Sequence, residues 1–387
     1  MNYEESILSK LSICVVVWGE EFVETFLNYS LLSILSEKNL PHLAKKVKIS
    51  MSIYTDKKGF QTIKKSASFK ILGELASINF FLVKGMKVLG PYRSMNDCHR
   101  HFISKNKKNS LMIICPDTLF SDSSLGYLYD IHSAENKPIC IFTPRTDKQE
   151  LLRIYQKNLR ADAKLALNNS DLLNLALENL HTETKSMILN SELENSSVSG
   201  GFYLENLDGL IGSQFHYYPI IFKLAEGTEL PDISIDSDFI NKIITDYNNL
   251  IVINDVKECC IIDITDRNRV HELSSERRSV AQIVQWANVN TGEINRKLFD
   301  EIFYFSRTGS NVSVKMKQEM IKIRDLIKKD LIPVQEMYSI ELNSTVPKRI
   351  FEIFKNNNLR SIIVKIVRKL YLLLFNGLII NVAERTK

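Results

Sequence analysis

Short apolar segments rich in β-branched residues alternate with amphipathic segments in the first part of the chain. Leu11–Trp18 is a continuous run of this kind, and such runs form strands buried on both faces of a parallel sheet. Further runs of this type are Val47–Tyr54, Ile78–Val83, Ser110–Cys115 and Pro138–Phe142. Helical spacing separates them, in Glu20–Leu35, Gly59–Lys65, Ser94–Ser104 and Leu125–Ala134. This alternation predicts an α/β fold with βαβ units around a mostly parallel sheet flanked by helices.

The second half of the chain changes character twice. Gln149–Ser191 is Leu-rich with helical spacing, and strand candidates follow at Phe215–Phe222, Leu250–Ile253 and Cys259–Ile264. Beyond about His271 the chain is predominantly helical and basic. A chain of 387 residues is long enough for one large α/β domain and an appendage. We therefore expect a domain over residues 1–270 and a helical, basic C-terminal region over 271–387.

Composition narrows the class of protein. Apolar residues make up 44% and charged residues 25%, so the chain is able to bury a core. The net charge of +5 is too weak to argue for nucleic acid, and an anionic membrane or substrate phosphates would explain it equally well. The six cysteines form no CxxC pair, which is typical of a reducing compartment. Because Met1–Lys10 does not resemble a signal peptide, we expect a cytoplasmic protein.

Several candidate ligand-binding residues follow predicted strands, where ligands of parallel α/β sheets bind. Trp18 and Gly19 end the first strand, and Tyr54 and Asp56 end the second. Tyr54 has a ring that stacks on a base, and Asp56 has a carboxylate that accepts hydrogen bonds from a ribose. The alternatives are an ordinary strand–helix turn at Gly19 and a helix N-cap at Thr55 or Asp56. Neither GxGxxG nor a P-loop is present.

A third group follows the predicted strand at Ser110–Cys115. Asp117 and Asp122 are hard oxygen ligands that would hold a divalent cation, Mn²⁺ or Mg²⁺, against a diphosphate. The alternative for Asp122 is a helix N-cap before Ser123 and Ser124.

Candidates for proton transfer lie further along the chain. His216 precedes Tyr217 and Tyr218 in a strand candidate, and is either a structural residue or a contact to a phosphate, a sugar hydroxyl or a metal. Asp255 and Glu258 follow another strand candidate, and either carboxylate is able to deprotonate an acceptor hydroxyl.

Taken together, these motifs resemble a group of bacterial glycosyltransferase-like proteins from surface polysaccharide and glycan gene clusters. The matching stretches cover about the first 270 residues and are Val15–Gly19, Tyr54–Asp56, Cys98–His99, Pro116–Ser124, Phe215–Pro219 and Asp236–Glu258. Two departures stand out. Asp255–Glu258 corresponds to a D-S-D-E segment of the family pattern but has Lys257 in the middle, and Tyr218 replaces a histidine.

The resemblance implies a Rossmann-like, GT-A-type domain that binds a nucleotide-sugar donor near Trp18, Gly19, Asp56 and Asp117, with His216 close to the phosphates or the acceptor. The implied activity is transfer of the sugar to a glycan or lipid-linked acceptor. The alternative is a non-catalytic assembly protein of a glycan-synthesis complex. Nucleic-acid binding rests on charge alone, without a reader motif, and is not expected.

The C-terminal segment Arg360–Ile380 mixes apolar blocks with cations. Cations cost about 2.5–3.5 kcal/mol each at a bilayer centre, which disfavours a spanning helix. Two alternatives are left. The segment either lies in the interface of an anionic membrane through Arg360–Lys369, at the inner face of the plasma membrane, or packs on the protein's own core.

Overall fold

The computed structural model describes most of the chain. The described residues are 10–83, 91–151, 167–191, 196–197, 200–230, 235, 239–244, 246–270, 273–274, 277–333 and 379–382. The predicted membrane contact Arg360–Lys369 and the acidic pair Asp236 and Asp238 lie outside these ranges.

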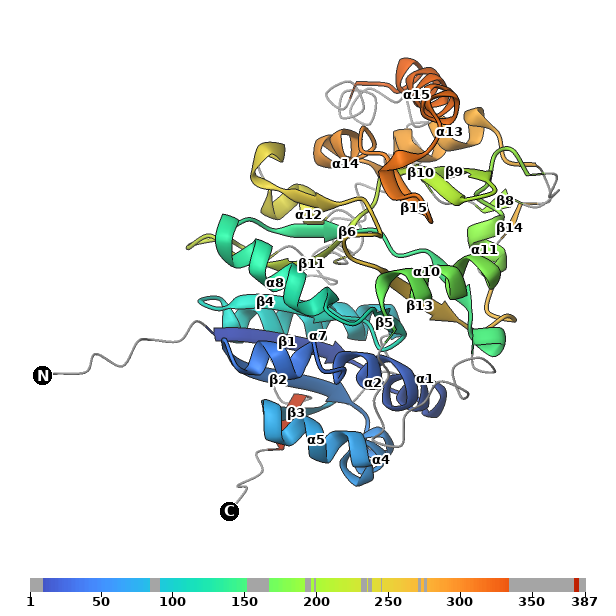
Figure 1. Ribbon diagram of the computed structural model, residues 1–387. Coiled ribbons are helices and arrows are strands. Elements are labelled where there is room, and N and C mark those ends of the chain that lie inside the picture. The colour runs from blue at the N-terminus through green and yellow to red at the C-terminus, as the bar shows by residue number, and fades with distance from the viewer. Residues whose placement is uncertain are drawn as a thin grey trace, which may run out of the picture.

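Eight strands of the described residues form one central sheet, in the order β12-β6-β11-β4-β1-β2-β3-β16 (Figure 1). Neighbouring strands from β3 to β4 are parallel, as are β6 and β12, whereas β11 is antiparallel to both of its neighbours and β16 is antiparallel to β3. The predicted fold class, a mostly parallel sheet flanked by helices, is confirmed. The strands are β1 (Lys10–Val16), β2 (Lys48–Thr55), β3 (Ser77–Val83), β4 (Ser110–Ile114), β6 (Ile139–Ile141), β11 (Tyr218–Phe222), β12 (Ile251–Ile253) and β16 (Ile379–Val382).

Alternate side chains of β1 build cores on the two faces of the sheet, as the two-residue period of a strand requires. Leu11, Ile13 and Val15 belong to one buried cluster, and Cys14 and Val16 belong to another. All five are at most 7% exposed, which explains why the β1 sequence is apolar without alternation.

Helices cover both faces of this sheet. Figure 1 shows α2 and α8 in front of it and α7 behind it. The first cluster takes its helical side chains from α1, α8 and their neighbours, and the second takes them from α7 and α12. The helices on this sheet are α1 (Glu20–Thr25), continued by a π-helical turn (Phe26–Ser30) and α2 (Leu31–Ile34), then α3 (Leu40–Ala44), α4 (Lys57–Lys65), α5 (Ala67–Leu75), α7 (Pro91–Asn106), α8 (Ser124–Glu135) and α12 (Phe239–Ile243).

Smaller sheets extend the molecule beyond the central one. One has the order β15-β10-β9 and packs against α13 and α15, another has the order β5-β13-β7, and β14 pairs with β8. Their strands are β5 (Thr118–Phe120), β7 (Arg145–Asp147), β8 (Ser196–Ser197), β9 (Gly201–Asn206), β10 (Gly209–Gln214), β13 (Ile261–Thr265), β14 (Leu273–Ser274) and β15 (Phe303–Ser306). The remaining helices are α10 (Asn169–Glu178), α11 (Thr182–Lys185), α13 (Val280–Asn290), α14 (Glu293–Leu298) and α15 (Val314–Lys329), with 3₁₀ turns at Tyr247–Asn249 and Gly309–Asn311.

The region beyond residue 271 contains strands as well as the expected helices. β15 pairs with β10, and β16 pairs with β3 at the edge of the central sheet. Strand pairing therefore links residues on both sides of the predicted boundary at 270 and 271, and that boundary stays a prediction. Among the helices of the described residues, none combines the length and the apolar character needed to cross a membrane.

Candidate functional site

The carboxyl ends of the central parallel strands define the candidate site. Chain order reverses at β1, because β2 lies on one side of it and β4 on the other, and ligands of parallel α/β sheets bind at the carboxyl ends beside such a reversal. The helices that follow β1 and β4 pack on the same face of the sheet. Trp18 and Gly19 follow β1, Asp56 follows β2 and Asp117 follows β4. Because neighbouring strands lie about 4.8 Å apart, the ends of β2 and β4 are about 10 Å from each other. The strand topology thus brings these four predicted residues to one edge.

Asp56 ties the first two strand ends together. One carboxylate oxygen accepts a hydrogen bond from Gly19 N at 3.0 Å, and the other accepts one from Gly59 N at 2.7 Å. The second bond makes Asp56 the N-cap of α4, as the alternative interpretation had it. Gly19 has φ of +79°, a conformation that favours glycine. The carboxylate of Asp56 therefore fixes the shape of the turn after β1.

Asp117 has a carboxylate neighbour that the sequence analysis did not find. β5 and β13 pair so that Asp263 lies opposite Thr118, and Ile264 N donates to Asp117 O at 2.8 Å. The oxygens of Asp263 accept hydrogen bonds from the Thr118 hydroxyl, at 2.6 Å, and from the Thr143 hydroxyl. Two carboxylates therefore share one partly buried corner at the end of β4.

The two carboxylates at this corner repel each other's charge. Burial, together with the nearby charge of Asp263, raises the pKa of Asp117 to about 7, against the opposing effect of Arg145 and Arg269. Burial also raises the pKa of Asp263, while its bonds from Thr118 and Thr143 act in the opposite direction. The pair holds a proton near neutral pH, and a cation would relieve the same repulsion.

Asp122 has partners of its own. The strand β5 lies between Asp117 and Asp122 in the chain. Asp122 accepts a hydrogen bond from Lys38 N at 3.1 Å and forms an ion pair with the Lys38 ammonium at 3.6 Å. Asp122 is therefore held by Lys38, and the cation between Asp117 and Asp122 stays a prediction.

Tyr54 lies in the core below this edge. Its side chain is fully buried, its ring stacks on Phe81 at 4.7 Å between centroids, and its hydroxyl lies 2.8 Å from His101 Nδ1. This position does not favour the predicted stacking of Tyr54 on a base.

Asp255 and Glu258 have separate partners. Asp255 follows β12 at the carboxyl edge, and its two oxygens accept hydrogen bonds from Lys257 N at 2.9 Å and Ser310 N at 2.7 Å. Glu258 is exposed and accepts a hydrogen bond from the Tyr127 hydroxyl at 2.7 Å. Both predicted bases follow β12, the outermost strand on this side of the sheet, and Asp255 is the nearer of the two to the strand end. Three strand spacings, about 14 Å, separate β12 from β4.

His216 precedes β11, which runs antiparallel and therefore begins at the same edge. Its ring lies edge-on to Trp286 at 5.1 Å between centroids, and Nε2 lies 3.2 Å from Asn290 O. Both partners belong to α13, so His216 connects the central sheet to the β15-β10-β9 layer.

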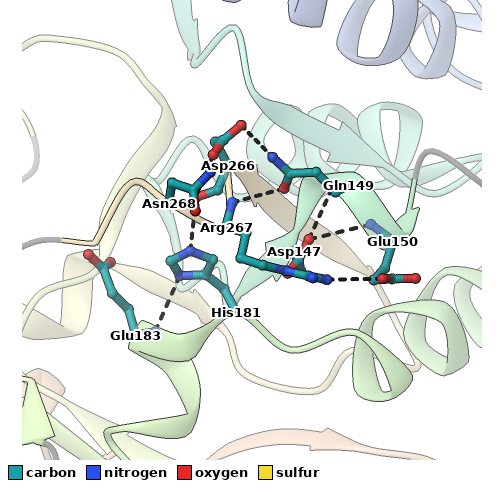
Figure 2. A network of polar contacts seen from close by, with 8 residues as sticks. All are labelled: Asp147, Gln149, Glu150, His181, Glu183, Asp266, Arg267 and Asn268. Atoms are coloured by element: carbon teal, nitrogen blue, oxygen red, sulfur yellow. Dashed lines mark hydrogen bonds and ion pairs between the residues drawn. The ribbon is translucent and has the colours of Figure 1, made fainter.

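Two arginines after β13 differ in their surroundings. Arg267 donates to Asp147 at 2.7 Å and to Glu150 at 3.0 Å, within the polar network of Figure 2. Arg269 reaches the start of α1, where it bonds Glu21 at 3.0 Å and lies over the Phe22 ring at 4.4 Å. Since α1 begins directly after Gly19, Arg269 brings a guanidinium that is ion-paired with Glu21 to the candidate site.

Comparison with known proteins gives only distant structural similarities. No family model matches the chain, and no curated protein matches it. A crystal structure of TarS residues 1–349 from S. aureus in complex with UDP-GlcNAc is similar at 11% identity and a TM-score of 0.38, covering 84% of this chain and 82% of that one. A second structure, of S. aureus TarS, is similar at 12% identity and a TM-score of 0.33, covering 84% of this chain and 50% of that one. With values this low, any statement about function rests on the site.

His181 is the buried centre of the network in Figure 2. Its Nδ1 accepts a hydrogen bond from Glu183 N at 3.2 Å, so Nε2 carries the proton that faces Asp266 O at 3.1 Å. Burial lowers the pKa of His181, because the charged imidazolium loses its hydration. A second proton on Nδ1 would also face the Glu183 N–H donor.

We expect this histidine to destabilise the fold in acid. The unfolded chain takes up a proton near pH 6.5, whereas the folded protein does so only at lower pH, so stability is present above about pH 6.5 and declines as the pH falls below it. Between pH 7.5 and 5.5, the thermal midpoint of His181→Gln should fall less than that of the wild-type protein. An equal fall in both proteins would contradict this assignment. Burial also lowers the pKa values of His101 and His132, but both histidines are present in the variant and in the wild-type protein, so they do not contribute to the difference.

Proposed function

We propose that this protein is a glycosyltransferase of the GT-A type that moves a sugar from a nucleotide-sugar donor to a glycan or lipid-linked acceptor at the cytoplasmic face of the membrane. The observation that carries the proposal is the Asp117–Asp263 carboxylate pair at the end of β4, the strand that pairs with β1. The donor class, the acceptor and the location follow the sequence resemblance.

In this proposal the donor lies across the ends of β2, β1 and β4. Asp56 sets the turn at Gly19, and Trp18, partly exposed beside it, offers an aromatic surface to the base. Arg269, bonded to Glu21, supplies positive charge toward the diphosphate. This arrangement would explain why candidate ligand-binding residues follow each of the three neighbouring strands β2, β1 and β4.

Asp117 and Asp263 fit a hard divalent cation. Mg²⁺ commonly takes one or two protein carboxylates and completes its shell with water and substrate phosphates. Within the described ranges, no group of three or more His, Cys, Asp or Glu side chains is placed to hold a metal ion, so two protein ligands are the relevant case. Such an ion would stabilise negative charge on the leaving diphosphate.

On the acceptor side, we assign the base to Asp255. Each of its oxygens accepts one backbone hydrogen bond, which orients the carboxylate and leaves lone pairs for the acceptor hydroxyl. His216, anchored to α13, would contact the phosphates or the acceptor from the start of β11.

A non-catalytic assembly role is the second candidate. Both predicted bases already form hydrogen bonds that stabilise the fold, which favours this role. Asp255 accepts a hydrogen bond from Ser310 N in the turn at Gly309–Asn311, and Glu258 accepts one from the Tyr127 hydroxyl. A measurement of catalytic activity distinguishes the two candidates, because only the glycosyltransferase needs the carboxylate of Asp117 for its function.

Binding of nucleotide-sugars tests the proposal. We expect one member of a panel of UDP-, GDP-, CMP- and dTDP-sugars to raise the thermal midpoint by several degrees when Mg²⁺ or Mn²⁺ is present. Arg269→Gln should weaken that binding about tenfold, because a charge-assisted hydrogen bond contributes about 1.5–3 kcal/mol. Lys46→Gln, which removes a surface cation paired with Asp130 on α8, is the control and should bind as the wild type does. The proposal fails if no member of the panel binds and none is hydrolysed.

A further inference from the structure

A small cavity lies between α10, the loop after β12 and the end of β15. Its volume is about 160 Å³. Drug-sized ligands occupy pockets of about 300–1,000 Å³, so this cavity suits a small ion or a single functional group. Its lining residues are Asn169, Ser170, Leu173, Asn174, Val256, Lys257 and Arg307.

The charges of the lining have one sign. Lys257 and Arg307 are the two ionisable residues of the lining, and both are cations. Neither forms an ion pair with the residues that the structure describes. Arg307 is held in place by neutral acceptors instead, with Nε donating to Asn174 Oδ1 at 2.8 Å and Nη1 donating to Leu207 O at 3.1 Å. These bonds orient the guanidinium, and no described carboxylate forms an ion pair with it.

The other side of the cavity is fixed by Asn169. Its side-chain nitrogen donates to Lys257 O at 2.7 Å, and its oxygen accepts a hydrogen bond from Cys260 N at 3.3 Å. Asp255 adds a bond to Lys257 N at 2.9 Å. The loop that carries Lys257 is therefore held against α10 before any ligand binds, and a preformed site loses less entropy on binding.

We propose that this cavity binds a phosphoryl group, as inorganic phosphate or as part of a phosphorylated molecule. An oxyanion would receive charge-assisted hydrogen bonds from Lys257 and Arg307 and neutral ones from Ser170 and the Asn174 amide. In this proposal Lys257, which stands where the family pattern has an acid, binds the phosphoryl group. The site differs from the proposed donor site, because three residues of extended chain, about 10 Å, separate Cys260 beside this cavity from Asp263.

Thermal shift with inorganic phosphate tests the proposal on the full chain. At matched ionic strength, we expect phosphate to raise the midpoint above that in chloride. Lys257→Gln should weaken phosphate binding about tenfold, and Arg307→Gln should do the same. Because Arg307 also bonds Leu207 O, the Lys257 variant is the decisive one; its side chain has no hydrogen bond to lose among the described residues. Lys297→Gln, which changes the charge equally on exposed α14, is the matched control.

Two ligands distinguish the source of the phosphoryl group. Methyl phosphate binding as tightly as inorganic phosphate would indicate a phosphorylated molecule, and binding of inorganic phosphate alone would indicate the free ion; both support the site. The proposal is overturned if phosphate gives no more stabilisation than chloride, or if Lys257→Gln responds like the wild type. Such failure leaves the proposed transferase function standing, because nucleotide-sugar binding is measured separately and Asp117→Asn should keep its phosphate response.

Discussion

Replacing Asp117 by Asn should reduce sugar transfer about 100- to 1,000-fold, the usual cost of removing one group that stabilises transition-state charge. The amide keeps the shape of the side chain but removes the charge that a cation needs. The measurement is the initial rate of product formation with the donor identified by binding. Asp130→Asn, which removes an exposed carboxylate paired with Lys46, is the control and should keep full activity. Unchanged transfer, or unchanged function in cells, would support the assembly role instead.

The same variant should be more stable than the wild-type protein. Since burial and Asp263 raise the pKa of Asp117 to about 7, the folded protein keeps a proton that the unfolded chain releases near pH 3.8. Wild-type stability is therefore lost as the pH rises through this interval. In the absence of cation and donor, the thermal midpoint of Asp117→Asn should exceed that of the wild type by about 2 °C or more at pH 8. The difference should shrink toward pH 4.5; a constant difference would contradict the raised pKa.

Asn39→Ala should lower the free energy of unfolding by about 3–5 kcal/mol, the largest effect on stability that we expect. Asn39 is fully buried between α2 and α3. Its amide nitrogen donates to Ser33 O and Ser121 O, and its oxygen accepts a hydrogen bond from Leu125 N at 2.9 Å. The variant would leave two or three buried groups without partners, each costing about 1–3 kcal/mol.

Chemical denaturation measures this loss directly. Asn248→Ala is the matched control, because Asn248 is exposed and the same truncation there should change stability by less than about 0.5 kcal/mol. If Asn39→Ala loses no more than this control, the buried bonds of Asn39 do not hold α8 to the α2–α3 connection.

The central strands were predictable because burial on both faces leaves a strong sequence signal. The predicted runs at Leu11–Trp18 and Val47–Tyr54 overlap β1 and β2, with ends that differ by one or two residues. The last residues of neighbouring parallel strands also lie at the same edge of the sheet. The meeting of Gly19, Asp56 and Asp117 at one edge therefore followed from three strand ends.

Other parts of the site depend on pairings that the sequence pattern does not encode. An apolar run such as Phe215–Phe222 has no direction, so the antiparallel placement of β11 was not visible. Asp263 is the single acid in Cys259–Ile264, a signal that could have marked it, but only the pairing of β13 with β5 shows its neighbour. Asp117 and Asp122 are close in the sequence, and the strand β5 lies between them in the chain.

The C-terminal strand β16 has a consequence for the behaviour of the whole molecule in solution. It supplies the outermost hydrogen-bonding row of the central sheet, along β3, whose sequence includes Phe80 and Phe81 (Figure 1). A bare edge with such a sequence is a template for another chain to add to the sheet. Ile379–Val382 thus covers the hydrogen-bonding edge of β3, and we expect a chain without these residues to pair through that edge with other molecules in solution.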